Sequence, residues 1–150
     1  MADNVTVKIS GLEDLQANLH ELDDAVQAKV VRAAVRAGAV EVQKEMVTLA
    51  PKDTGLLAEH FDIKTKKQRG VADAVSAFIG PNSKQVIHPQ EGGKTKGLPR
   101  TALFISKLLE FGSARMSKKP FLTQAASTSR DRALNAIIDK LKAGLSKWLQ

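Results

Sequence analysis

The sequence contains no cysteine and no tyrosine, and its aromatic residues are few: five phenylalanines and one tryptophan in 150 residues. The absence of cysteine excludes disulfides, thiolate catalysis and cysteine-ligated zinc. No apolar run approaches the roughly 20 residues that cross a bilayer, so we expect no membrane partner. The polar, acidic start Met1-Ala2-Asp3-Asn4 does not resemble a signal peptide, and we expect the protein to stay in the cytoplasm where it is made.

Residue patterns of catalysis are also missing. His20, His60 and His88 are scattered over different predicted elements, and their spacing is not that of metal ligands. The sequence contains neither a glycine-rich phosphate loop nor a nucleophile elbow. We therefore predict that the protein is not an enzyme, with no catalytic residue, no metal site and no cofactor.

The charge is large and unevenly distributed. A chain of 150 residues has the usual size of one domain, so residues 1–150 are predicted to form a single domain. Its net charge is +7, but residues 1–50 carry −3, residues 51–100 carry +4 and residues 101–150 carry +6. A basic face can attract nucleic acid, an acidic membrane surface or an acidic protein, and charge alone does not choose among them.

The first third of the chain predicts a strand followed by two helices. Val5, Val7 and Ile9 alternate with polar residues, as in a half-buried strand over 5–10. Leucines spaced by three and four residues indicate a short helix over 12–22. A longer helix is predicted from Asp23 to Ala50, ended by Pro51. Its apolar stripe is Val26, Val30, Ala34, Gly38, Val42, Met46 and Leu49, and its Lys29, Arg32, Arg36 and Lys44 are interpreted as a solvated outer face.

The middle of the chain predicts a basic hairpin. Apolar residues alternate in two segments, first at Phe61, Ile63 and Thr65 and then at Val75, Ala77 and Ile79, which favours two antiparallel strands. Cations gather where the first strand ends, at Lys64, Lys66, Lys67 and Arg69. Such a tip can contact phosphates, which require charge and reach rather than a sequence code, or it can be a solvated turn.

Residues 81–100 are rich in Gly, Pro, Lys and amides and include Lys94 and Lys96. A loop of this length inside a compact domain is uncommon unless it is functional or disordered. We predict a flexible loop over 81–100, with Lys94 and Lys96 as further candidates for contact with DNA or a partner.

A joint is predicted between residues 101 and 122. The period of Thr101 to Phe111 is ambiguous, and we favour a short helical or irregular start that passes into a strand ending at Gly112. Pro120 suits the first turn of a helix, which Phe121 and Leu122 would enter as core anchors. The residues expected to fix this strand–helix joint, or to serve in assembly, are Glu110, Phe111, Gly112, Ser113, Pro120 and Phe121.

The last helix ends near Trp148, which is either an intramolecular core plug, the interpretation we favour, or an assembly contact. Together these elements predict an α+β fold: a small antiparallel sheet packed against one long helix, with a C-terminal helix.

Three segments occur in an order typical of one protein family. They are Ile9-Ser10-Gly11-Leu12-Glu13-Asp14-Leu15 after a first strand, Ala50-Pro51-Lys52-Asp53-Thr54-Gly55-Leu56-Leu57 after a long helix, and Leu109-Glu110-Phe111-Gly112-Ser113 followed by Lys119-Pro120-Phe121-Leu122-Thr123-Gln124-Ala125. In this order the chain resembles the small neck proteins of long-tailed double-stranded-DNA bacteriophages. These are the head–tail joining or tail-completion proteins, with minor tail protein Z-like members. The absence of tyrosine before Glu110 and the segment 81–100 depart from the family pattern.

The resemblance implies a structural virion protein rather than an enzyme. It implies a ring of subunits, six in the expected form, around the DNA channel between the head connector and the tail-terminator or tail-tube proteins. The protein would reside in the host cytoplasm during assembly and then in the neck or tail of the virion. The alternative from another class is a basic nucleic-acid-binding protein that coats DNA without forming a ring; steep salt dependence of tight duplex binding would identify it.

Overall fold

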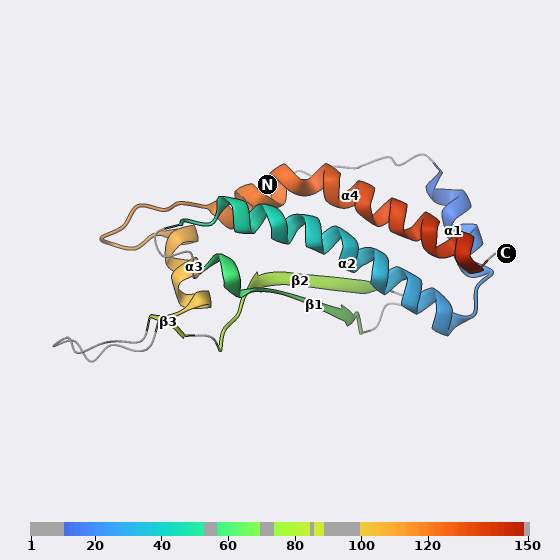
Figure 1. Ribbon diagram of the computed structural model, residues 1–150, viewed down its shortest axis with the longest axis horizontal. Coiled ribbons are helices and arrows are strands. Elements are labelled where there is room, and N and C mark those ends of the chain that lie inside the picture. The colour runs from blue at the N-terminus through green and yellow to red at the C-terminus, as the bar shows by residue number, and fades with distance from the viewer. Residues whose placement is uncertain (1–10, 53–56, 70–73, 85, 89–99, 149–150) are drawn as a thin grey trace.

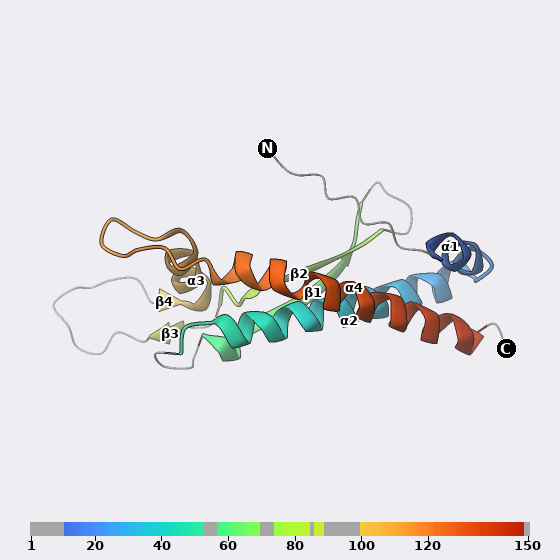
Figure 2. The ribbon, with the colours of Figure 1, turned by 90° about the horizontal axis from the view of Figure 1, so that it is seen from above.

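The computed structural model describes residues 11–52, 57–69, 74–84, 86–88 and 100–148. Its longest elements are two helices that lie side by side, with a two-stranded hairpin packed against one of them (Figures 1 and 2). The predicted α+β class is thereby confirmed, with its small antiparallel sheet, long helix and C-terminal helix. The strand predicted over 5–10 lies outside the described residues.

The two predicted N-terminal helices are present. Helix α1 (Leu12–His20) begins after Gly11, whose φ of 81° is a left-handed conformation that suits glycine. Helix α2 (Asp24–Leu49) begins one residue after the predicted start at Asp23 and ends at Leu49, with Ala50 as the capping residue before Pro51. Its buried residues include Val30, Ala34, Gly38 and Met46, as the predicted stripe requires.

Helix α4 (Phe121–Trp148) runs antiparallel to α2, so the start of one helix lies beside the end of the other (Figure 1). Two glycines allow this contact. A Cβ atom at Gly38 would lie 2.5 Å from Ile137 Cγ1 and 2.9 Å from the Ala133 carbonyl oxygen, and one at Gly144 would lie 2.7 Å from Val30 Cγ1. All three distances are too short for real atoms, so the two helices approach each other this closely only because both positions lack a side chain.

The hairpin packs on the side of α2 away from α4 (Figure 1). A short 3-10 helix, η1 (Ala58–His60), leads into β1 (Phe61–Lys67), which pairs with β2 (Val75–Pro81) in the predicted antiparallel arrangement. Ile63 is opposite Ile79 and Thr65 opposite Ala77, so the two alternating sets predicted from the sequence lie on the same face of the hairpin. Gln43 on α2 donates a side-chain hydrogen bond to the Phe61 carbonyl and joins the helix to the sheet.

The segment predicted as a loop over 81–100 is partly ordered into strands. Strand β2 continues through Pro81, and β3 (Val86–His88) pairs antiparallel with β4 (Arg100–Thr101). These two short strands were not predicted from the sequence. The short alternation of β3 is too brief to stand out in a stretch of loop-forming residues, and residues 89–99 lie outside the described part of the chain.

A second correction concerns residues 101–111, where the predicted strand is a helix, α3 (Ala102–Phe111). Its buried residues Ala102, Ser106 and Glu110 recur every four positions on one face. Thr101 caps the helix, because its Oγ1 accepts a hydrogen bond of 3.2 Å from the Phe104 N–H. The predicted strand–helix joint is thus a helix–helix joint.

The largest cluster of buried apolar residues lies at one end of the molecule, where α3 and the start of α4 meet the end of α2. Phe61 and Phe121 form its aromatic centre, with ring centroids 6.1 Å apart in an edge-to-face arrangement. The remaining buried members are Met46, Ala50, Leu57, Ala102 and Ala125. At the other end α1 packs against α4.

Candidate functional site

The joint between α3 and α4 is held by one buried carboxylate. Glu110, near the end of α3, is only 8% exposed. Its two oxygens accept hydrogen bonds from the backbone N–H groups of Leu122 (2.9 Å) and Thr123 (3.0 Å), in the first turn of α4, and from the Thr123 hydroxyl. A carboxylate at this position satisfies N–H groups that lack partners within the helix and faces the positive end of the helix dipole. Glu110 therefore caps a helix other than its own.

The connection over residues 112–120 follows from the conformation of Gly112. Its φ of 77° is unfavourable for other residues, and a Cβ there would lie 2.9 Å from the Met116 carbonyl oxygen. Ser113 and Met116 exchange two backbone hydrogen bonds, of 2.9 and 3.2 Å, and the Lys119 N–H donates to the Leu109 carbonyl at 2.6 Å. The predicted joint residues therefore lie close together, and their contacts hold the connection between α3 and α4 in place.

The predicted anchors behave differently from one another. Phe121 is 4% exposed and lies in the core, as predicted, while Leu122 is half-buried against it. Pro120 stands immediately before the first residue of α4 instead of inside its first turn. Phe111, which the sequence places in an apolar run, is 79% exposed, so it points away from the core.

Four of the six aromatic side chains are exposed in the described part of the chain. The exposed fractions are 61% for Phe78, 50% for Phe104, 79% for Phe111 and 50% for Trp148. Phe104 and Phe111 are seven residues apart on α3, on the same side of the helix. Trp148 is half-exposed, so it is not a fully buried core residue.

The hairpin cations are exposed, as predicted. Strand alternation places Lys64 and Lys66 on the outer face, where Lys64 is opposite Phe78, and Lys67 on the face toward α2. Arg69 follows the strand, near the tip. Lys94 and Lys96 lie outside the described residues.

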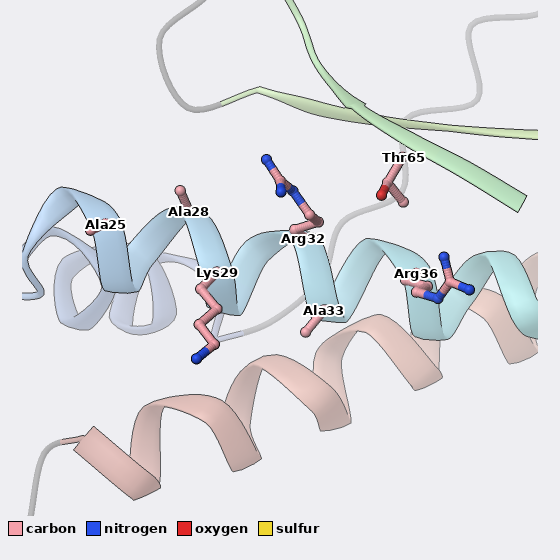
Figure 3. A pocket seen from close by; sticks show the side chains of 7 residues that line it. All are labelled: Ala25, Ala28, Lys29, Arg32, Ala33, Arg36 and Thr65. Atoms are coloured by element: carbon pink, nitrogen blue, oxygen red, sulfur yellow. The ribbon is translucent and has the colours of Figure 1, made fainter.

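A groove missed by the sequence interpretation lies between the first half of α2 and β1. Its volume is about 440 Å³. Arg32 leaves α2 on the side of the strand that carries Thr65, and Arg36 extends along the helix, while Lys29 points to the α4 side (Figure 3). The other lining residues are the alanines Ala25, Ala28 and Ala33. No acidic side chain lines the groove among the described residues.

A smaller groove of about 270 Å³ lies on the other side of α2, against the end of α4. Its cations are Lys29, Lys140 and Lys147, and Trp148 lies at its end. Lys29 and Ala33 line both grooves. Three of the four side chains predicted as a solvated helix face, Lys29, Arg32 and Arg36, thus line two neighbouring grooves on α2.

The ion pairs of the described chain are elsewhere. Glu41 pairs with Lys44 at 2.6 Å, and Glu45 pairs with Arg132 of α4. Both glutamates lie on the later half of α2. No salt bridge joins Lys29, Arg32 or Arg36 to another described residue. Their spacing of three and four residues in the sequence already places these three cations on one side of the helix. That this side forms the wall of a groove depends on where the hairpin packs.

Two further features bear on function. Within the described ranges, no group of three or more His, Asp or Glu side chains could hold a metal ion. Of the helices the structure describes, none has the length and apolar character required to span a membrane.

The fold and surface define a small α+β protein organised on a pair of long antiparallel helices. A family model matches residues 13–112, from α1 through the end of α3. It is HK97-gp10-like, described as "Bacteriophage HK97-gp10, putative tail-component". The match covers more than half of the chain, so this protein belongs to that family of bacteriophage tail components. No curated protein and no solved structure matches the chain.

Proposed function

We propose that this tail component acts in the neck of the phage particle as a tail-completion protein. It forms a ring, six-membered in the expected form, around the DNA channel and joins the head connector to the tail-terminator or tail-tube proteins. Family membership supports a structural role in the tail and a place in the virion. This role needs no catalysis, and subunits made in the host cytoplasm enter the particle during assembly.

The observation that carries this proposal is the exposure of four of the chain's six aromatic residues among the described positions. Aromatic side chains are the usual anchors of protein interfaces, where they fill pockets on a partner. A chain with few aromatics would bury them in its own core if it acted as an isolated monomer. Here two are buried, and the rest are available to a neighbour.

Helix α3 is the strongest candidate for the subunit interface. One face packs Ala102, Ser106 and Glu110 inward, and the opposite side presents Phe104 and Phe111 to solvent. A helix that is apolar on both sides is normally covered on both sides. Met116, 38% exposed, adds a third apolar side chain from the connection that follows α3.

In a ring of this kind the hairpin cations Lys64, Lys66, Lys67 and Arg69 face either the DNA or an acidic neighbouring ring. Contact with duplex DNA would be non-specific, because phosphate contacts position a protein without reading the sequence. Lys94 and Lys96 join this set as sequence-based candidates.

Light scattering over a concentration series, with and without tail proteins, tests the ring. We expect a ring, or a monomer that becomes a ring on tails, and we expect Phe111→Ser to abolish it while circular dichroism stays unchanged. Phe78→Ser is the matched control, because this phenylalanine is also exposed but stands alone beside Lys64 on the hairpin. A wild-type protein that stays monomeric with tails, or assembly that survives Phe111→Ser, would contradict the proposal.

A further inference from the structure

The cations on both sides of the first half of α2 form a surface that is separate from the hairpin tip and from the exposed aromatics of α3. We call it the α2 cationic surface, and it comprises Lys29, Arg32, Arg36, Lys140 and Lys147. We propose that this surface binds the phosphate backbone of nucleic acid, with Arg32 and Arg36 as its central contacts. The proposal does not require a ring.

The arrangement of the two arginines supports phosphate as the ligand. Arg32 and Arg36 are four residues apart, so they stand one above the other on α2, about 6 Å apart along the axis at roughly 1.5 Å per residue. Both line the larger groove together with Thr65, and Figure 3 shows Arg32 leaving α2 on the side of the strands while Arg36 extends along the helix. A guanidinium offers two parallel N–H donors to phosphate oxygens, and the Thr65 hydroxyl supplies a further donor.

Burial and charge favour the same ligand. Lys29, Arg32 and Arg36 are exposed, and the described lining of either groove contains no carboxylate that would compete for them. Lys67, two residues beyond Thr65 on the same side of β1, extends the positive wall toward the hairpin tip. A linear polyanion laid along α2 can therefore contact several cations in succession.

A protein partner fits this surface less well than nucleic acid. The uncharged lining residues that α2 contributes to the larger groove are Ala25, Ala28 and Ala33, which provide little apolar area. No aromatic side chain lines this groove, and Trp148 is the one aromatic residue among those that line the smaller groove. Protein interfaces depend on large anchors at a desolvated centre. The exposed aromatic pair of this molecule is on α3, at the opposite end of α2 (Figure 1).

The experiment measures binding of a fluorescently labelled 25-base-pair duplex by anisotropy between 50 and 300 mM salt. The test variant is the double substitution Arg32→Gln with Arg36→Gln, and the control is Lys52→Gln with Arg130→Gln. Both remove two positive charges, but Lys52 and Arg130 are exposed residues that line neither groove. Poly-glutamate of similar charge serves as the competing class of partner.

We expect wild type and control to show the same slope of log affinity against log salt. The test variant should lose about 1.8 from the magnitude of that slope, since each phosphate contact contributes about 0.9 on duplex DNA. Lys29→Gln alone should lose about 0.9. Equal losses in test and control variants, no duplex binding by wild type at 50 mM salt, or tighter binding of poly-glutamate than of duplex would each overturn the proposal.

Light scattering on the same two double variants separates this inference from the proposed ring. Neither substitution touches α3, so both variants should assemble like wild type. An Arg32→Gln, Arg36→Gln variant that assembles but binds DNA with the wild-type slope would overturn the α2 cationic surface and leave the ring intact. A wild type that binds as expected but never assembles would overturn the ring alone.

Discussion

The two ends of the long helix pair are held together by different means. At the α3 end, large side chains meet around Phe61 and Phe121, and the buried Glu110 closes the joint. Along the middle and the α1 end, contact relies on small residues: Ala34, Gly38 and Ala39 on α2, and Gly144 on α4. At the α3 end, large buried side chains supply the stability. At the other end the two helices lie close together, and the long cationic side chains of α2 remain on the surface.

The sharpest test of this contrast is a pair of phenylalanines. Phe121→Ala should lower the free energy of unfolding by about 3 to 5 kcal/mol, because the ring is buried against Phe61 and its removal leaves a cavity. Phe111→Ala, ten residues earlier and 79% exposed, should change it by less than about 0.5 kcal/mol in the unassembled protein. Urea denaturation of both variants measures the difference. Equal losses would contradict the placement of the core.

The second test removes the hydrogen bonds of the α3–α4 joint and leaves the apolar core residues in place. Glu110→Ala should cost about 2 to 3 kcal/mol, since the N–H groups of Leu122 and Thr123 lose their acceptor in a buried place. Glu110→Gln keeps one amide oxygen as an acceptor and should cost less. Thermal unfolding followed by circular dichroism ranks the variants. Glu59→Ala, at an exposed position, is the control, and a loss there as large as at Glu110 would argue against a capping role.

The smallest effect is expected at the close contact of the helices. Alanine is favoured over glycine in a helix by about 1 kcal/mol, but the Cβ of Gly38→Ala would clash with Ile137 and with the Ala133 carbonyl, which costs about 1 to 3 kcal/mol. The net result should be a loss of about 0 to 2 kcal/mol in the free energy of unfolding, measured by chemical denaturation. Gly80→Ala meets open space and should be within about 0.5 kcal/mol of wild type. A stabilised Gly38→Ala protein would show that the helices can separate there without cost.

Much of this architecture could be predicted from periodic patterns. Alternation at Ile63 and Ile79 predicted the antiparallel hairpin, and the apolar stripe through Gly38 predicted the long helix. Helix α3 was mistaken for a strand because it is apolar on nearly every side, so its period was hidden. The exposed phenylalanines on α3 explain that ambiguity, because apolar residues on an interface cannot be distinguished from core residues in the sequence alone.

The candidate site was only partly predictable for a related physical reason. The sequence shows that Glu110 and Phe121 belong to one joint, but not that the carboxylate of one helix caps the next. It also shows that Arg32 and Arg36 lie on the outer side of α2, away from the apolar stripe. Whether such a side is convex or forms the wall of a groove depends on where the hairpin packs, and that is a property of tertiary structure.

The antiparallel pairing of α2 with α4 also constrains the order of events during synthesis. Gly144 follows Val30 by 114 positions in the sequence, although the two residues are neighbours in the folded protein. Contacts this distant in sequence form late, and α4 leaves the ribosome after every other described element. We therefore expect the small-residue face of nascent α2 to stay uncovered until α4 has been synthesised. Chains whose synthesis stops before α4 would keep this face exposed, and we expect them to be degraded by proteases instead of entering a growing particle.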